Sequence, residues 1–177
     1  MSMAPSPRPS DARIIVVMGV SSSGKSTVGA ALAARLDAPF LDGDGYHPPA
    51  NVEKMRAGTP LTDEDRWPWL ERLALALREA ADTSRIAVGA CSALRRTYRD
   101  YITRKAGEPV VFVYLEGKKD VIRERIAIRR HEFMPASLLD SQFATLEPPA
   151  ADENAIAVPV TETVEEIVGR VALALAR

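Results

Sequence analysis

The chain has 177 residues, of which 46% are hydrophobic and 27% charged, with a formal net charge of −1. This length favours one domain with its own core, and the balanced charge excludes a general attraction to nucleic acid or to an anionic membrane. Cys91 is the only cysteine, which excludes an intrachain disulfide and suits the reducing cytoplasm in which we expect the protein.

Residues 1–12 are rich in proline and serine and lack the apolar stretch of a signal peptide, which predicts a disordered leader before a single domain over 13–177. Apolar runs then alternate with helical patterns. We expect strands at 14–18, 38–42, 86–90, 109–115 and 155–160, and helices at 25–36, about 50–57, 63–82, about 93–105, about 118–129, 136–146 and 163–176. This alternation predicts an α/β fold with a five-stranded parallel sheet.

A phosphate-binding loop follows the first strand. The segment GVSSSGKST at 19–27 fits the pattern G-x-x-x-x-G-K-[ST] between a buried strand and a helix. Its backbone amides and the helix N-terminus would hold phosphates, Lys25 would reach the β- and γ-phosphates, and Ser26 would ligate Mg²⁺. The expected nucleotide-binding residues are Gly19, Ser21, Ser22, Ser23, Gly24, Lys25, Ser26 and Thr27. The motif by itself does not separate kinases from ATPases or GTPases.

Two carboxylates, Asp42 and Asp44, follow the second expected strand. Ligands of parallel α/β sheets bind at the carboxyl ends of the strands. We expect Asp42 to join the Mg²⁺ shell, directly or through water, and Asp44 to orient or deprotonate an attacking hydroxyl. The alternative is an ordinary turn, because D-G-D-G is also a common turn sequence. No N-K-x-D signature for guanine is present, which weighs against a GTPase.

Three longer segments closely resemble gluconokinases: 42–70 (DGDGYHPPANVEKMRAGTPLTDEDRWPWL), 90–100 (ACSALRRTYRD) and 133–149 (FMPASLLDSQFATLEPP). With the phosphate loop, the resemblance runs from about residue 14 to the C-terminus. It implies a P-loop kinase fold like that of shikimate kinase, with a lid that closes over ATP. It also implies transfer of phosphate from ATP to the 6-hydroxyl of D-gluconate, Mg²⁺ as cofactor, and a homodimer.

A site for a polyhydroxy acid needs cations and hydrogen-bond partners, and Arg can grip a carboxylate with two bonds. Arg66 and Arg99, with Lys54, are expected to orient the acid end, while Asp44 faces the reacting hydroxyl and His47 bonds to other hydroxyls. The expected substrate-binding residues are Asp44, His47, Lys54, Arg66, Ser92 and Arg99. Against this, His47 could be a plain loop residue and Lys54 a solvated one, and Trp67 and Trp69 are better explained by packing.

Basic residues crowd the end of the helix at about 118–129, inside an expected lid at about 123–136. We expect Arg129 first and Arg125 second to stabilise charge on the transferring phosphoryl group; the alternative is a solvated face neutralised by neighbouring acids. Two positions depart from the gluconokinase pattern. Ser22 replaces a frequent glycine, with little effect if its backbone angles are ordinary, and Glu132 replaces the usual lid histidine.

The sequence therefore predicts an ATP-dependent gluconate kinase with catalytic residues Lys25, Asp44, Arg125 and Arg129. Two alternatives stay open: a kinase for another small hydroxy acid such as shikimate, and a nucleotide-binding regulatory module with little turnover, which Glu132 motivates. Nucleic-acid binding has little support, because charge is balanced and no basic-aromatic platform is present.

Overall fold

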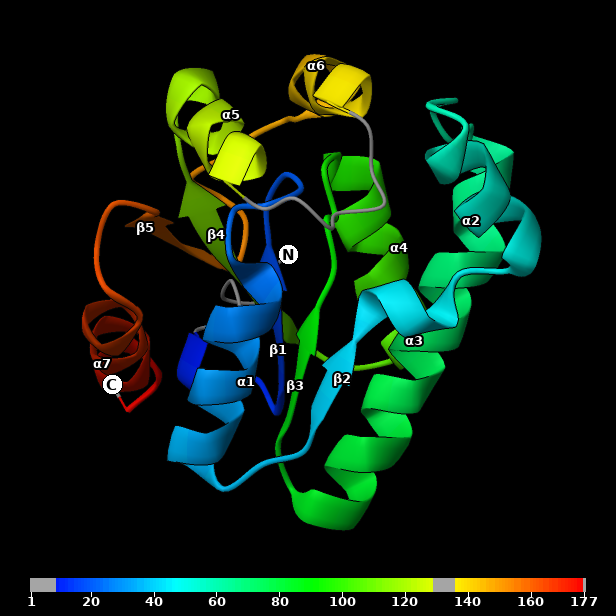
Figure 1. Ribbon diagram of the computed structural model, residues 1–177. Coiled ribbons are helices and arrows are strands. Elements are labelled where there is room, and N and C mark those ends of the chain that lie inside the picture. The colour runs from blue at the N-terminus through cyan, green and yellow to red at the C-terminus, as the bar shows by residue number, and fades with distance from the viewer. Residues whose placement is uncertain (1–8, 129–135, 177) are drawn as a thin grey trace.

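A computed structural model describes residues 9–128 and 136–176 (Figure 1). Within these ranges five parallel strands form one sheet in the order β2-β3-β1-β4-β5. The strands are β1 (Ile14–Met18), β2 (Phe40–Asp42), β3 (Ala87–Ala90), β4 (Val110–Glu116) and β5 (Ala155–Pro159). The predicted α/β class with a parallel five-stranded sheet is confirmed.

The central strand β1 is an uninterrupted apolar run because both of its faces are covered by helices. All five of its residues are buried, and Ile14 pairs with Ala87 of β3 on one side and Val110 of β4 on the other. The edge strand β2 is only half-buried and is shorter than the expected 38–42. The core therefore sits around β1, and the chain leaves this strand directly into the phosphate loop.

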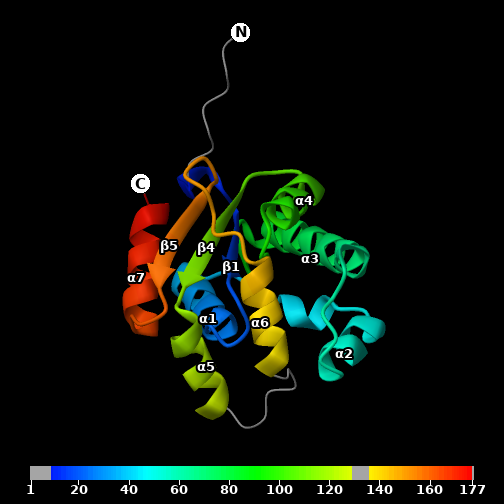
Figure 2. The same ribbon diagram turned by 90° about the horizontal axis from the view of Figure 1, so that it is seen from above.

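Two layers of helices enclose the sheet (Figure 2). Helices α1 (Lys25–Leu36) and α7 (Val164–Leu175) pack together on one face, and α3 (Asp63–Ser84) and α4 (Arg96–Ala106) pack together on the other. A capping box begins α3, because Thr62 accepts from the Asp65 amide while the Asp65 carboxylate accepts from the Thr62 amide. None of the described helices is both long and apolar enough to cross a bilayer.

Shorter elements gather at the carboxyl ends of the strands, at the top of Figure 1. They are the 3-10 helix η2 (Gly43–Tyr46) and helices α2 (Pro49–Arg56), α5 (Lys119–Ile128) and α6 (Ala136–Thr145). The expected lid at about 123–136 runs from α5 into α6, and residues 129–135 lie outside the described part.

The N-terminal prediction needs a correction for a few residues. Pro9–Asp11 form the short 3-10 helix η1 instead of a disordered stretch, and Ala12 packs against the core. Residues 1–8 of the expected leader lie outside the described residues.

Candidate active site

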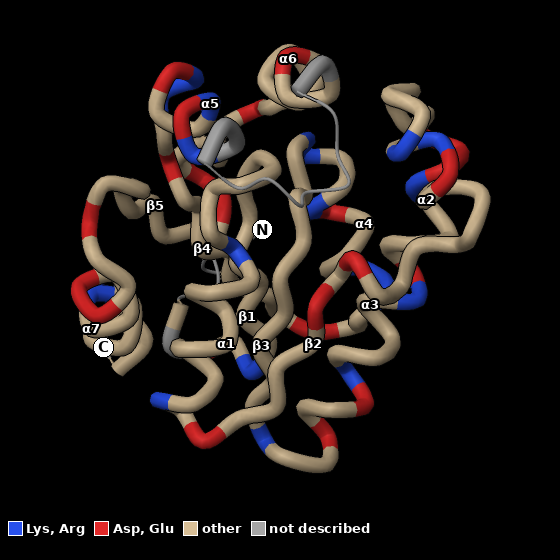
Figure 3. The backbone as a smooth tube through the Cα atoms, viewed as in Figure 1, with Lys and Arg blue, Asp and Glu red and all other residues tan. Residues whose placement is uncertain are grey.

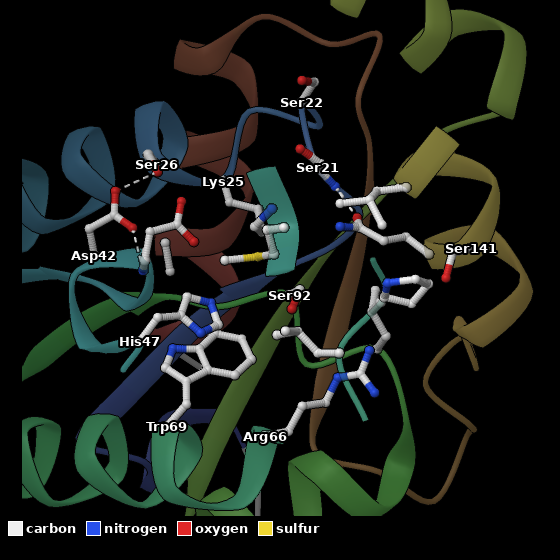
Figure 4. A pocket seen from close by; sticks show the side chains of 18 of the residues that line it. Ser21, Ser22, Lys25, Ser26, Asp42, His47, Arg66, Trp69, Ser92 and Ser141 are labelled. Atoms are coloured by element: carbon white, nitrogen blue, oxygen red, sulfur yellow. Dashed lines mark hydrogen bonds between the residues drawn. The ribbon is translucent and has the colours of Figure 1, made fainter. Parts of the chain in front are cut away.

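A cavity of about 500 Å³ opens at the carboxyl ends of β1, β2 and β3 (Figure 4). Most residues that the sequence assigned to catalysis or binding line it: Ser21, Ser22, Gly24, Lys25, Ser26, Thr27, Asp42, Asp44, His47, Arg66 and Ser92. The volume is typical of a site for small ligands. Figure 3 shows acidic and basic residues interspersed along the described part of the chain.

The phosphate loop has the backbone shape that its motif predicts. Gly24 is the N-cap of α1 with a φ of 97°, a conformation that glycine adopts at no steric cost. Gly19 has a φ of 148°, and a Cβ there would lie 2.9 Å from Ser23 Oγ and 3.2 Å from the Leu115 carbonyl oxygen. Gly19 and Ser23 thus shape the loop without lining the cavity. Lys25 Nζ donates to the Val20 carbonyl oxygen at 3.1 Å, within the loop it would serve.

Ser22 departs from the ordinary backbone angles on which the prediction of a small effect depended. Its φ is 62°, in the left-handed region, and its side chain is almost fully buried at the cavity wall. A residue with a Cβ pays about 1–2 kcal/mol for this conformation, which glycine avoids. Ser22 therefore carries backbone strain that a glycine at this position would avoid.

Replacing Ser22 by glycine is expected to stabilise the protein by up to about 1 kcal/mol, because relief of strain exceeds the added unfolded-state entropy of about 0.4–1 kcal/mol. Thermal unfolding of Ser22→Gly should show a melting temperature about 2–4 °C higher. The matched control is Ser23→Gly, whose φ is not positive and which should not gain stability. A lower melting temperature for Ser22→Gly than for the parent would contradict the assignment of strain.

Ser26 and Asp42 form the part of the cavity suited to a divalent cation. The Ser26 hydroxyl donates to Asp42 Oδ2 at 2.8 Å, and Asp42 Oδ1 accepts from the Asp44 backbone amide at 3.0 Å. Hydroxyl and carboxylate oxygens are the ligands that Mg²⁺ prefers, usually together with water and substrate phosphates. No group of three or more His, Cys, Asp or Glu side chains placed to hold a metal occurs among the described residues. The site thus fits Mg²⁺ that arrives with a nucleotide.

Arg66 lines the cavity on a side different from Lys25 (Figure 4). Its Nη1 donates to the Tyr98 hydroxyl at 2.8 Å, and its guanidinium lies 5.0 Å from the centre of the Tyr98 ring. The Tyr98 hydroxyl donates to Asp63 at 2.5 Å, and burial together with this bond raises the pKa of Tyr98 to about 12. Tyr98 therefore stays protonated and fixes the arginine, which suits the expected grip on a carboxylate.

His47 stacks on Trp69 at the cavity wall, with ring centres 3.9 Å apart and planes 20° from parallel. Trp69 is itself held by a hydrogen bond from its Nε1 to the Gly43 carbonyl oxygen at 2.7 Å. Burial and the nearby charge of Arg66 lower the pKa of His47 to about 4. The ring is therefore neutral at physiological pH. Trp69 is buried in the core, as expected, but it also lines the cavity itself and supports His47 there.

Arg99 is expected to bind the substrate, but it does not line the cavity. Its side chain is 1% exposed and holds the Glu153 carboxylate through Nε at 2.7 Å and Nη2 at 3.1 Å. It also donates to the carbonyl oxygens of Ala93 at 2.8 Å and Glu147 at 2.9 Å. With four hydrogen bonds to protein acceptors and a side chain that is almost fully buried, this guanidinium is committed to the protein interior. Arg99 instead ties α4 to the segment that leads into β5.

Arg99→Lys is expected to lower stability by about 1–3 kcal/mol, since lysine keeps the charge but cannot reproduce the fork of hydrogen bonds. Thermal unfolding should report a fall of about 2–4 °C for each kcal/mol. The control is Arg104→Lys on the exposed side of the same helix, which should change stability by less than about 0.5 kcal/mol. An unchanged melting temperature together with a large rise in the KM of the acceptor would instead show that Arg99 binds the substrate.

Two other predicted cations also lie outside the cavity lining. Lys54 pairs with Asp65 at 2.7 Å, and this hydrogen bond is the main cause that lowers the pKa of Asp65 to about 2. Arg125 donates to the carbonyl oxygens of Val160 at 2.6 Å and Ser23 at 3.3 Å, so it supports the phosphate loop from behind. Arg129 and Glu132 lie outside the described residues.

Gln142 and Ser141 of α6 line the cavity although the sequence assigned them no role. Gln142 Oε1 accepts from the Ser21 amide at 2.6 Å, so the helix after the expected lid contacts the phosphate loop directly. Both residues lie in the segment that resembles gluconokinases, but a short helix does not reveal from its sequence which side faces a ligand. Cys91, by contrast, is buried, and burial raises the pKa of its thiol to about 12.

Comparison with known proteins places the chain among P-loop kinases. The model of the AAA domain family matches residues 14–149. Gluconokinase of Gluconobacter oxydans is 50% identical over 146 residues, which is 82% of either chain. The crystal structure of a gluconokinase from Sinorhizobium meliloti has a TM-score of 0.82 at 45% identity, covering 97% of this chain and 94% of that one. Shikimate kinase from Aquifex aeolicus shares the fold at a TM-score of 0.59 and 20% identity, covering 92% of this chain and 96% of that one. This chain belongs to the gluconokinase family.

Proposed function

We propose that the protein transfers the γ-phosphoryl group of ATP to the 6-hydroxyl of D-gluconate, giving ADP and 6-phosphogluconate. The observation that carries this proposal is one cavity with Lys25 and the phosphate loop on one side, Arg66 on another, and Asp44 and His47 at its wall. Lys25 is placed to pair with the phosphates of ATP, and Arg66 is placed to pair with the carboxylate of gluconate. Membership in the gluconokinase family supports the choice of acceptor.

In this mechanism the residues of the chain mainly position and stabilise charge. The loop amides and Lys25 hold the phosphates, and Arg66 holds the gluconate carboxylate. Asp44 accepts the proton of the 6-hydroxyl as its oxygen attacks the γ-phosphorus and the bond to the ADP oxygen breaks. Ser26 and Asp42 would hold Mg²⁺, which neutralises phosphate charge when bound. Arg129, and Arg125 once released from its present carbonyl partners, are proposed to act from the lid.

An acceptor panel tests this function. With ATP and Mg²⁺, release of ADP is measured with D-gluconate, shikimate and other aldonates at equal concentrations. We expect D-gluconate to give a much higher kcat/KM than the rest. Faster turnover of another acid would identify a kinase with a different acceptor, and ATP binding without turnover on any acid would favour the regulatory module. The homodimer, which rests on the family resemblance, and the cytoplasmic location, which rests on the single cysteine, are also part of this proposal.

A further inference from the structure

Asn51 does not itself line the cavity, but it contacts His47, which does. It lies on α2 and is 3% exposed. Its Nδ2 donates to the Asp65 carbonyl oxygen at 2.9 Å and lies 3.3 Å from His47 Nδ1. A backbone carbonyl only accepts, so the amide atom that faces it must be the nitrogen. The same nitrogen faces the imidazole, and an amide nitrogen only donates.

This geometry determines where the imidazole carries its proton. Because Asn51 offers a donor to Nδ1, that ring nitrogen must be the acceptor and is unprotonated. A neutral imidazole then carries its proton on Nε2. The stack on Trp69 fixes the plane of the ring, and Figure 4 shows the ring directed into the cavity. His47 therefore presents a fixed N–H donor to whatever binds there.

We propose that Asn51 is a positioning residue that holds His47 as its Nε2–H tautomer, so that His47 donates a hydrogen bond to an oxygen of the acceptor and does not take its proton. The statement about the acceptor rests on the proposed function, whereas the tautomer does not. The charged side chains that line the same cavity are Lys25, Asp42, Asp44 and Arg66. With His47 restricted to donating, the hydroxyl proton goes to a carboxylate of the same cavity, which in the proposed function is Asp44.

The tautomer is measured by ¹H–¹⁵N correlation spectra of the imidazole nitrogens in the whole protein. The chain has two histidines, His47 and His131, so His131→Gln assigns the signals. From about pH 6 to about pH 8 we expect an unprotonated Nδ1 and a protonated Nε2 in His47. An Nδ1–H tautomer, or a charged ring in this range, would overturn the proposal.

Asn51→Asp tests whether Asn51 is the cause. A carboxylate only accepts, so Nδ1 should gain a proton and the spectrum should show the other tautomer or the charged ring. The KM of D-gluconate should rise about tenfold, as for the loss of one hydrogen bond, while the KM of ATP changes little. Ala50→Asp is the matched control, because it adds the same charge at an exposed position of α2. An unchanged tautomer and an unchanged KM in Asn51→Asp would refute the role of Asn51.

If Asn51→Asp does not fold, Asn51→Leu removes the donor without adding a charge. A mixture of both tautomers is then expected in the spectrum, and a pure Nε2–H form would contradict the proposal. The proposed function and the tautomer of His47 can be refuted independently. Absence of gluconate phosphorylation in the parent protein would refute the proposed function, whereas the spectrum of the same protein still decides the tautomer.

Discussion

Replacement of Lys25 by methionine is expected to lower kcat/KM for phosphoryl transfer by at least about 10²–10³-fold, the usual loss when one preorganised donor is removed from developing charge. Lys25 begins α1 and lines the cavity beside the loop that would hold the phosphates. Methionine keeps the length of the side chain and its packing but removes the positive charge. Steady-state kinetics with saturating gluconate measure the loss.

Lys54→Met is the matched control for this change. Lys54 lies on α2, its ammonium is paired with Asp65, and it does not line the cavity. We expect its kcat/KM to stay within a few-fold of the parent. Near-normal turnover by a folded Lys25→Met protein would remove the phosphate loop from the reaction, and with it the proposed arrangement.

Asp44→Asn is expected to lower kcat by about 10²–10⁴-fold, the range for loss of a general base, while ATP still binds. Asn has nearly the shape of Asp but cannot accept the proton of the attacking hydroxyl. The Asp44 backbone amide, which donates to Asp42, is unaffected by the change. Single-turnover rates at saturating substrates, with ATP affinity measured separately by calorimetry, separate the chemical step from binding.

Asp42→Asn distinguishes the two carboxylates. Because Asp42 accepts from the Ser26 hydroxyl, its loss should raise the Mg²⁺ concentration needed for half-maximal activity. Asp44→Asn should leave that requirement nearly unchanged. An Asp44→Asn rate equal to that of the parent would exclude Asp44 from the chemistry, and a shared rise in the Mg²⁺ requirement would make both residues metal ligands.

The order of strands and helices could be predicted because periodicity and the phosphate-loop motif are local signals. The start of α4 could not. A helix was expected from about residue 93, but Ala93 has a φ of 45°, in the left-handed region, and the helix begins at Arg96. The local sequence does not indicate this conformation. It is stabilised by contacts such as the hydrogen bond from Arg99 to the Ala93 carbonyl oxygen.

In the site, too, residues in local motifs could be predicted, whereas residues whose partners are distant in the sequence could not. The loop residues and the two aspartates follow from strand ends and motif spacing. Arg99 was assigned to the substrate because a basic residue in a family motif is an obvious ligand for an acid. Its partner Glu153 lies 54 residues further along the chain, and only the folded structure pairs them. Gln142 was overlooked for the same reason, since its partner Ser21 is 121 residues away.

One cavity is proposed to hold the phosphates of ATP at the loop and gluconate between Asp44 and Arg66. A crystal structure with Mg²⁺, a non-hydrolysable ATP analogue and D-gluconate tests it most directly. We expect the gluconate carboxylate to contact Arg66 and the 6-hydroxyl to lie within hydrogen-bond distance of Asp44, in line with the γ-phosphorus. Gluconate bound in the opposite direction, or outside this cavity, would contradict it.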